Sequence, residues 1–530
     1  MNVSIPFGFQ TYRSELPVDA TTLPVALGVT AALGVFLIRH LLATDNTQIK
    51  KLRGWPLVGQ WSFFTKSVKR GMVGALYSLT HGLYLTCKSL DFIMNGFHQT
   101  ANEPMFGFNI LQHNIVAVRG EEARKVFFDR RDLSFTEGYR LLFGNGPNAK
   151  DVVEDVADLD DQGQVSVFGR RLSSILRMHR LTALTPLFMS DLERNMSKWG
   201  SSGKFDPFDD IYSMVFQLTV RAAACREIAD SIDDCKRMEE LYWQVEQGST
   251  PTSTLFPWFP SPARILKIKA TVQIYCWFDA IIKARKEENR REEDTLQVLM
   301  DAGDSTADII QFVLKTLFAG VVNSGLMSAW IFIYLDQEPE WKGKVVAELQ
   351  SLLNKYSPAS DQFSSAAERL SCIPSEAWEG EMPVLEAKLP ERNYSPFLRR
   401  VIKGDLDLGG KKIPNGSFLV YLITETHNNP DIYPDPAKFN PSRFSEGQDK
   451  SQYHAFLGWG VGRHPCLGRR FAQYEIKAIC ALFLSQYHYE VVNSKGVRPH
   501  PSTVVPDRNN LYQVRPKDFY IKYTRREEAL

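Results

Sequence analysis

Apolar residues return every three or four positions in most of the chain before Ile373. This spacing predicts helices, and six segments show it: 121–128, 172–198, 208–230, 231–247, 263–288 and 295–300. Residues 106–118 have a β-like apolar pattern instead. Beyond Ile373, proline, glycine and asparagine interrupt the chain, which predicts loops and strands. Within this region, residues 406–420 are expected to form a hairpin that turns at Gly409 and Gly410.

Residues 308–335 form a long, apolar and nearly uncharged stretch, with Lys315 as the only charged residue between its two ends. A helix of this composition has no polar face to present to water, so it must be buried on most sides. Gly320 and Ser324 are small and leave space along the helix. We therefore expect a core helix here, with room beside it.

A second apolar run lies near the amino end. Residues 23–38 are uncharged and almost wholly apolar, and residues 41–43 extend the run past Arg39. This approaches the ~20 residues of a membrane-spanning helix, and the long side chain of Arg39 can reach the membrane surface. An uncleaved anchor is favoured over a cleaved signal peptide, because Arg13 is the only basic residue that precedes the run.

Basic residues follow the anchor, at Lys50, Lys51, Arg53, Lys66, Lys69 and Arg70. Positive charge stays on the cytosolic side of a membrane, so the body of the protein is expected to face the cytosol, at the endoplasmic reticulum. The chain is accordingly divided into a luminal segment (1–20), a transmembrane anchor (21–43), a Pro/Gly hinge (44–60) and a catalytic body (61–530).

Composition excludes several classes of function. The chain has 530 residues, of which 44% are apolar, and this is ample for a large core. The net charge is +1, so nothing points to nucleic acid. Seven cysteines are scattered without paired spacing, which argues against a disulfide framework or a zinc site and favours a reducing compartment.

The densest chemical signal surrounds Cys466. Residues 456–468 read Phe-Leu-Gly-Trp-Gly-Val-Gly-Arg-His-Pro-Cys-Leu-Gly, and a helix-like run follows. Gly460 and Gly462 permit a positive φ and the close approach of the backbone to a flat ligand. The segment therefore predicts a tight loop that presents one sulfur at the start of a helix.

The surroundings of this sulfur are basic. The helix N-terminus and nearby Arg463, Arg469 and Arg470 would favour the thiolate of Cys466 over its thiol. A thiolate held in this way is the axial ligand expected for an oxygen-splitting haem.

The segment resembles the haem-binding loop of the cytochromes P-450, the haem-thiolate monooxygenases. That family usually places Phe seven, Gly four and Arg two residues before the cysteine, and Gly two after it, where this chain has Trp459, Gly462, His464 and Gly468. The resemblance covers most of the chain and is most specific over residues 405–475. It implies one large, mostly helical domain with small β-sheets, and haem b with Cys466 as the thiolate ligand of its iron.

The histidine before the cysteine resembles the sterol 14-demethylase and prostacyclin-synthase branches, and the style of the loop resembles filamentous-fungal members. In those branches a histidine takes over the contact to a haem propionate that arginine normally makes. By resemblance, His464 or Arg463 binds a propionate in this chain. The same resemblance implies that the other loop residues help to hold the cofactor: Trp459, Gly460, Gly462 and Gly468.

In the resembled family the core helix crosses the distal face of the haem, and Gly320 matches the point where it opens for oxygen. The family motif there is Ala-Gly-x-Asp/Glu-Thr-Thr, whose acid–alcohol pair relays protons to dioxygen. Residues 319–324 instead read Ala-Gly-Val-Val-Asn-Ser, so Val322 replaces the acid and Asn323 the first threonine. Asn323 could hydrogen-bond oxygen or order a water, and Ser324 could help.

The family also carries a Glu-x-x-Arg motif before the cysteine, and here the chain departs further. Glu391 stands at the expected place, but Tyr394 takes the position of the arginine, and Pro390 would disturb a helix interior. The arginine that pairs with this motif is present as Arg443. The resemblance thus implies that Glu391 and Arg443 retain the cofactor, with Glu391 paired to Arg443 alone or to Arg392 in an altered turn.

The leading hypothesis is a monomeric, membrane-anchored monooxygenase of a hydrophobic small molecule such as a terpenoid, sterol, polyketide or fatty acid. Electrons would come from NADPH through a cytochrome P-450 reductase that docks near four basic residues: Arg463, Arg469, Arg470 and Lys477. Asn323 motivates a second hypothesis, a reductase-independent isomerase or dehydratase of a peroxide. The missing Glu-x-x-Arg arginine motivates a third, a non-catalytic relic that binds haem or lipid.

Overall fold

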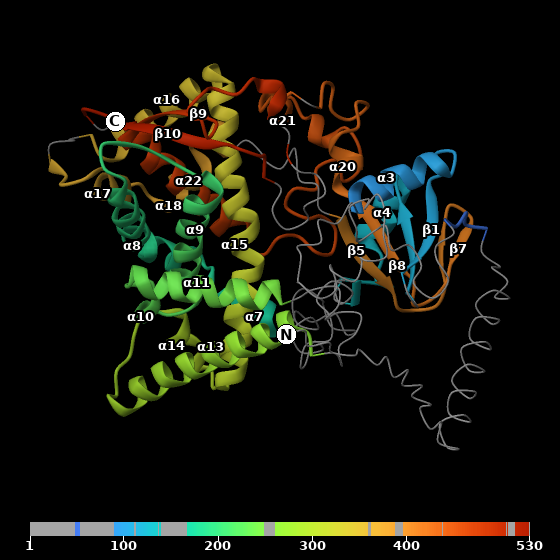
Figure 1. Cartoon of the computed structure of the whole chain (residues 1–530), viewed down its shortest axis with the longest axis horizontal. Helices are drawn as coiled ribbons and strands as arrows, with labels where there is room; N and C mark the ends of the chain where they lie inside the picture. Colours follow the sequence, from blue (N-terminus) through green and yellow to red (C-terminus); the bar gives the residue numbers. More distant parts are fainter. Residues whose placement is uncertain are drawn as a thin grey trace, which may run out of the picture.

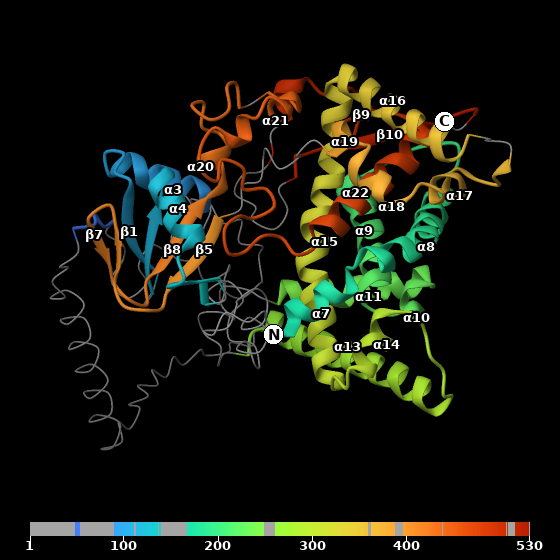
Figure 2. The same cartoon turned by 180° about the vertical axis from the view of Figure 1, so that it is seen from behind.

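A β-sheet part and a larger helical part make up the protein, and the chain crosses between them through loops around α20 and α21 (Figures 1 and 2). The computed structural model describes residues 48–52, 89–110, 113–135, 137–138, 167–248, 260–358, 362–386, 396–436, 438–504, 506, 515–528 and 530. The predicted luminal segment, membrane anchor and most of the hinge lie outside these residues.

The main sheet has five strands in the order β1-β2-β8-β5-β3. Their bounds, in this order, are Met105–Ile110, His113–Val118, Phe418–Leu422, Pro396–Val401 and Leu133–Ser134. Strands β2 and β8 run parallel, and the other neighbours run antiparallel. The β-like pattern of residues 106–118 is therefore confirmed as the antiparallel pair of β1 and β2.

Side chains alternate across this sheet, and both faces are buried. Phe106 and Phe108 pack in one cluster with residues of α3 (Ser89–Gln99). Val401 and Tyr421 pack in a separate cluster with residues of α4 (Glu121–Asp129). Because helices cover both of its faces, the sheet is a fixed support for the loops that leave its edge.

Two smaller β structures complete the sheet content of the described residues. The predicted hairpin is confirmed as β6 (Leu406–Leu408) and β7 (Lys411–Ile413), and its turn has φ values of 58° at Gly409 and 73° at Gly410. A three-stranded sheet in the order β4-β10-β9 lies against the helical part, with bounds Ser202–Phe205, Tyr520–Arg525 and Tyr487–Val492.

Helix α15 (Thr306–Gln337) runs through the helical part (Figure 1). It begins at a capping box, in which the Ser305 side chain accepts from the Asp308 amide and Asp308 accepts from the Ser305 amide. It packs against α9 (Pro207–Ala223). A Cβ on Gly325 would lie 2.8 Å from the Tyr212 ring of α9, so glycine is what allows the two helices to approach this closely.

Most of the other helices lie in the helical part with this pair, whereas α20 and α21 lie in the loops between the two parts (Figure 1). Their bounds are α7 (Val167–Ile175), α8 (Met178–Met196), α10 (Arg226–Ala229), α11 (Ile232–Gln247), α13 (Pro262–Glu287), α14 (Thr295–Asp301), α16 (Pro339–Tyr356), α17 (Ala366–Ser371), α18 (Ser375–Gly380), α19 (Pro383–Glu386), α20 (Ile423–His427), α21 (Ser442–Ser445) and α22 (Arg469–Gln486). The single helix expected over 172–198 is wrong, because an extended Arg177 separates α7 from α8.

The burial expected for the long apolar helix is confirmed. Within the described part of the chain, α15 is the one helix long and apolar enough to cross a membrane, and 61% of its most apolar window is buried inside the protein. Its composition thus reflects a place in the core.

A buried ion network ties α13, α10 and the start of α14 together. The fully buried Arg285 donates to Glu227 over 2.8 and 2.6 Å and to Asp294 over 2.9 Å. Asp294 also accepts from the Gln297 amide and so caps α14. Each buried charge is offset by several hydrogen bonds, which is the condition under which such a network is stable.

We predict that Arg285→Met lowers the free energy of unfolding by about 3–5 kcal/mol, because it leaves Asp294 buried without its cationic partner. The matched control is Lys283→Met on the same helix, whose ion pair with Asp279 is exposed. Urea unfolding followed by far-ultraviolet circular dichroism measures both variants. Equal shifts of the two midpoints would contradict the assignment of the network as a stabilising core.

Candidate functional site

Cys466 lies in an irregular loop that ends where α22 begins. The Cys466 amide donates to the Trp459 carbonyl over 2.7 Å, and the Gly460 amide donates to the Leu457 carbonyl over 3.0 Å. The first bond joins the two ends of the loop from Trp459 to Cys466, and the second closes a tight turn just before it. The sulfur is therefore presented three residues before the first residue of α22, as the sequence predicts.

Both loop glycines are required by the backbone. Gly460 and Gly462 have φ values of 67° and 63°, which side chains rarely tolerate. A Cβ on Gly460 would lie 2.5 Å from the His464 carbonyl oxygen, and a Cβ on Gly462 would lie 2.4 Å from the Phe128 carbonyl oxygen. The predicted positive φ at these two positions is confirmed.

The last turn of α4 anchors the loop to the sheet part. The Arg463 amide donates to the Phe128 carbonyl over 3.1 Å. Asp129 accepts from the Tyr453 hydroxyl over 2.8 Å and contacts the His454 ring nitrogen at 2.9 Å. One helix end thus holds the chain both before and within the cysteine loop.

The Cys466 side chain is exposed at the surface of the loop. Protein packed around the loop nevertheless withdraws the thiol from water, and this burial raises its pKa. The Gly468 amide and the Arg469 guanidinium lower the pKa by less. The amide at the helix start and Arg469 thus act in the predicted direction, but they offset only part of the effect of burial. A metal ion bound to the sulfur would supply the missing stabilisation, because coordination deprotonates a thiol.

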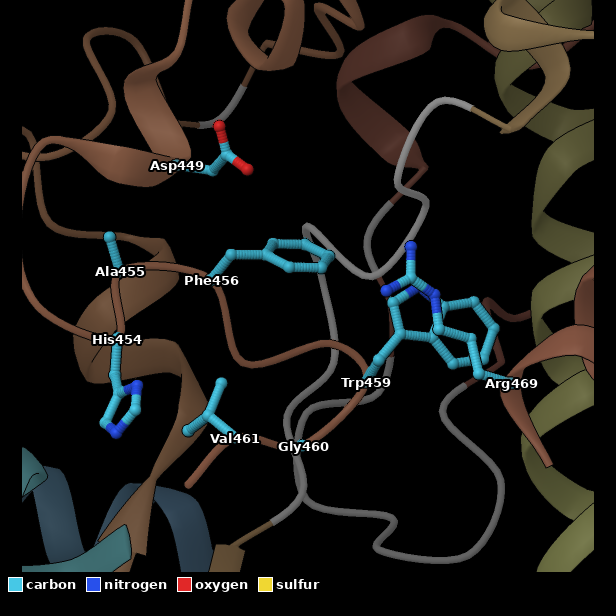
Figure 3. Close-up of a pocket in the computed structure, with 8 residues that line it drawn as sticks. All are labelled: Asp449, His454, Ala455, Phe456, Trp459, Gly460, Val461 and Arg469. Carbon is cyan, nitrogen blue, oxygen red and sulfur yellow. The ribbon is translucent and has the colours of Figure 1, made fainter. Parts of the chain in front are cut away.

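A recess of about 360 Å³ lies on the loop just before the cysteine (Figure 3). Its walls are Asp449, His454, Ala455, Phe456, Trp459, Gly460, Val461 and Arg469. Figure 3 shows Arg469, from the first turn of α22, beside Trp459, and the guanidinium carbon is 5.8 Å from the centre of that ring. Trp459 therefore links the loop to the helix that follows it.

His464 stacks on Phe135, with ring centres 5.3 Å apart. Phe135 also faces the guanidinium of Arg399 on β5 at 4.8 Å. Arg399 is fully buried, and it donates to the Leu398 carbonyl over 2.8 Å. His464 and Arg399 thus contact the same ring, that of Phe135. Both side chains can donate hydrogen bonds to a carboxylate. The side chain of Arg463, the alternative to His464, is half-buried.

The distal candidates on α15 occupy different faces of the helix. Asn323 and Ala319, one turn apart, are exposed, whereas Ser324 is buried. Gly320 faces α9, where a Cβ would lie 3.3 Å from the Thr219 side chain. The helix continues unbroken through Gly320, without the opening that was expected there. Roles for Asn323, Ser324 and Gly320 in the reaction stay predictions.

The short α19 ends at Glu386, and Glu391 lies outside the described residues. Its expected partner Arg443 is 2% exposed. Its guanidinium donates to the carbonyls of Asn440 over 3.1 Å and Lys438 over 2.8 Å. Carbonyl dipoles from its own segment therefore offset part of the buried charge.

The basic surface around the cysteine is smaller than the sequence predicts. Arg469 and Arg470 are exposed, but Lys477 is only 2% exposed. The Lys477 ammonium donates to the Trp378 carbonyl over 2.7 Å and pairs with Glu386 at 3.3 Å. The prediction that Lys477 contributes to a docking surface is wrong, because it faces α18 and α19 inside the protein.

Sequence reasoning missed two buried charged residues near this site, Arg399 and Glu475. Both carried a signal. Arg399 lies on the same face of β5 as Phe397 and Val401, and Glu475 lies at helical spacing from Phe471 and Ile479. A charge on the apolar face of a strand or helix marks a buried position that the apolar pattern alone does not explain.

Comparison with known proteins identifies the family. Residues 78–514 match the family model described as Cytochrome P-450. Cytochrome P-450 monooxygenase AacuE of Aspergillus aculeatus is 28% identical, over 89% of this chain and 92% of its own. Sterol 14-demethylase of Arabidopsis thaliana is 28% identical, over 73% and 79%. The solved structure "Retinoic acid bound cyanobacterial CYP120A1" has a TM-score of 0.65 and 20% identity, covering 91% of this chain and 100% of the other.

The residues present fit the haem that this family carries. A single exposed thiol stands on a loop whose two glycines leave no room for a side chain. His464 of the loop and the buried Arg399 of β5 both contact the Phe135 ring. Both side chains can bind carboxylates, such as the propionates of a haem. The chain therefore belongs to the cytochrome P-450 family of monooxygenases, oxidoreductases that hold haem through a cysteine thiolate and use a redox partner.

Proposed function

We propose that this protein inserts one oxygen atom from dioxygen into a hydrophobic small molecule, in fungal specialised metabolism. The observation that carries the proposal is the Cys466 loop, in which two glycines with positive φ present one thiol at the start of α22. The proposed metabolic setting is supported by similarity to fungal monooxygenases, such as dmxR5 of Cryptosporiopsis sp., which is 30% identical over 73% of this chain and 77% of its own.

The haem supplies the dioxygen-activating chemistry when it is bound. Cys466 holds the iron, and the loop residues Trp459, Gly460, Gly462 and Gly468 keep the backbone close to the flat ring. His464 and Arg399, which face the same Phe135 ring, bind the propionates, and Arg463 is the alternative donor. The buried Arg443, with Glu391 as its expected partner, would retain the segment that holds the haem. On the distal side Asn323 and Ser324 order the proton donors, and Gly320 lets α15 pack on α9.

Electrons come from NADPH through a cytochrome P-450 reductase. The exposed Arg469 and Arg470 at the start of α22 attract an acidic partner surface close to Cys466. The apolar run at the amino end anchors the protein in the endoplasmic reticulum membrane with its catalytic body in the cytosol, where the reductase and apolar substrates are available.

Asn323 supports a second candidate function. An amide has no acidic proton to give, and rearrangement of a peroxide substrate needs no proton delivery to dioxygen. A reductase-independent isomerase or dehydratase is therefore the alternative for the same site.

The first test is the spectrum of the dithionite-reduced protein under carbon monoxide. The red-shifted Soret band of a thiolate-bound haem is expected in the parent and lost in Cys466→Ala, because no other side chain of the loop offers a thiolate. Cys372→Ser, which changes an exposed cysteine after α17, should keep the band. A parent protein without this band would remove the basis of the proposed oxygenase.

The glycine requirement gives a second prediction. In Gly462→Ala, an L-residue at positive φ costs about 1–2 kcal/mol before the clash with the Phe128 carbonyl is counted, so haem content and thermal midpoint should both fall. Gly343→Ala on α16 is the control, because its added Cβ meets open space and helix propensity favours alanine by roughly 0.5–1 kcal/mol. Equal haem content in both variants would show that the loop does not depend on the glycine.

The reaction itself is tested with labelled dioxygen. The parent and Cys466→Ala are reconstituted with the reductase and NADPH, and offered a panel of sterols, terpenoids, polyketides and fatty acids under ¹⁸O₂. One ¹⁸O atom per product molecule, from the parent alone, is the expected result in mass spectrometry. Turnover of a peroxide without NADPH or reductase would decide for the isomerase instead.

A further inference from the structure

His427 is the last residue of α20, and its buried ring meets the chain that leads into the cysteine loop. The Leu457 amide donates to the Nε2 atom of His427 over 3.0 Å. Because a backbone amide can only donate, this ring nitrogen carries no proton and the ring is neutral. The ring also stacks on Phe456, a wall of the recess in Figure 3, with ring centres 5.6 Å apart. One side chain therefore holds two consecutive residues of the loop.

His427 is one of three buried side chains that bind alternate residues before the cysteine. Arg124 of α4 donates to the Tyr453 carbonyl over 2.8 Å. The Tyr433 hydroxyl donates to the Ala455 carbonyl over 2.9 Å. A spacing of two residues is that of a strand in a sheet, and here side chains take the place of the neighbouring strand. Of the three, His427 alone accepts a hydrogen bond, and it acts closest to the cysteine.

The position of the histidine is set by the main sheet. α20 follows β8 directly, so the sheet determines where this short helix begins. Thr426, the residue before the histidine, has no exposed surface and accepts from the Arg124 guanidinium over 3.2 Å. Its hydroxyl also lies 2.8 Å from the Tyr421 hydroxyl of β8. A ring carried by such a supported segment is held in one place.

Three hydrogen bonds lead from this ring to the cysteine. The first is the bond to the Leu457 amide, and the second joins the Leu457 carbonyl to the Gly460 amide. The third joins the Trp459 carbonyl to the Cys466 amide. We propose that His427 is a positioning residue for the Cys466 thiolate, because its neutral ring fixes the turn from which the sulfur is presented. This inference rests on haem ligation by Cys466 in the proposed function.

The role requires an acceptor with a particular reach. The amide oxygen of a glutamine can stand where Nε2 stands, whereas the side chain of an asparagine is shorter by one methylene. A phenylalanine keeps a flat ring that can stack on Phe456 but offers no acceptor. Without an acceptor the buried Leu457 amide is left unsatisfied, and the loop must move to relieve it. Variants at His427 can therefore separate the accepting role from the stacking role.

Hydrogen exchange in the holoprotein tests the first bond, with mass-spectrometric fragmentation that resolves the Leu457 amide. We expect this amide to be protected in the parent and in His427→Gln. Its exchange should be about tenfold faster in His427→Phe and His427→Asn, because a buried donor has lost its acceptor. The matched controls are His98→Gln and His98→Phe at an exposed histidine of α3, which should leave the exchange of Leu457 unchanged.

The reduced spectrum under carbon monoxide tests the positioning of the sulfur. Compared at equal haem content, His427→Phe and His427→Asn should lose thiolate-type band and gain the band of a haem without a thiolate. His427→Gln should restore the parent spectrum, and both His98 variants should match it. A histidine that only stabilises the fold would lower the thermal midpoint and the haem content without changing the type of band that the bound haem shows.

The outcomes separate this inference from the proposed function. A parent protein without the thiolate band fails the proposed function, and the positioning role falls with it. A parent with the band, whose His427→Phe and His427→Asn variants keep it in full, overturns the positioning role alone. If those two variants bind no haem, the parent and His427→Gln still decide. Both must protect the Leu457 amide and show the same band, and an unprotected amide in the parent refutes the inference.

Discussion

The contact between the last turn of α4 and the backbone of Gly462 is the constraint on which the site depends. A Cβ on Gly462 would clash with the Phe128 carbonyl, so only a glycine fits at this position. The same helix end receives the Arg463 amide and holds the chain at His454 through Asp129. The sheet that supports α4 therefore determines where the loop turns, and with it where the sulfur and α22 begin.

The loop is connected to the core of the helical part through three packed helices, α22, α15 and α9. α22 leaves the loop, enters the helical part and packs on α15, which in turn lies against α9 at two glycines, Gly320 and Gly325. The cysteine side and the distal side of the site are thus connected by packed helices. A change at the loop alters where α22 begins, and with it the packing of α22 on α15.

The sequence predicts the elements that have a periodic apolar pattern and the turns that require a glycine. The core helix over residues 308–335, the hairpin at paired glycines and the cysteine loop all belong to this kind. What it does not predict are contacts between distant segments. Lys477 reads as a surface cation but is buried, because periodicity reveals the apolar face of α22 and not the carbonyls of α18 that replace water there. The break at the extended Arg177 is not marked by a proline or a glycine, so the sequence pattern does not reveal it.

The burial of Lys477 has a consequence for electron transfer. With that cation turned inward, the exposed positive charge of α22 near the site is confined to its first two residues, Arg469 and Arg470. Leu467, the residue next to the cysteine, is 45% exposed. Leu467 and Gly468 are the two residues that separate this short patch from Cys466 in the sequence. A redox partner attracted by positive charge would therefore meet only a short patch beside the cysteine.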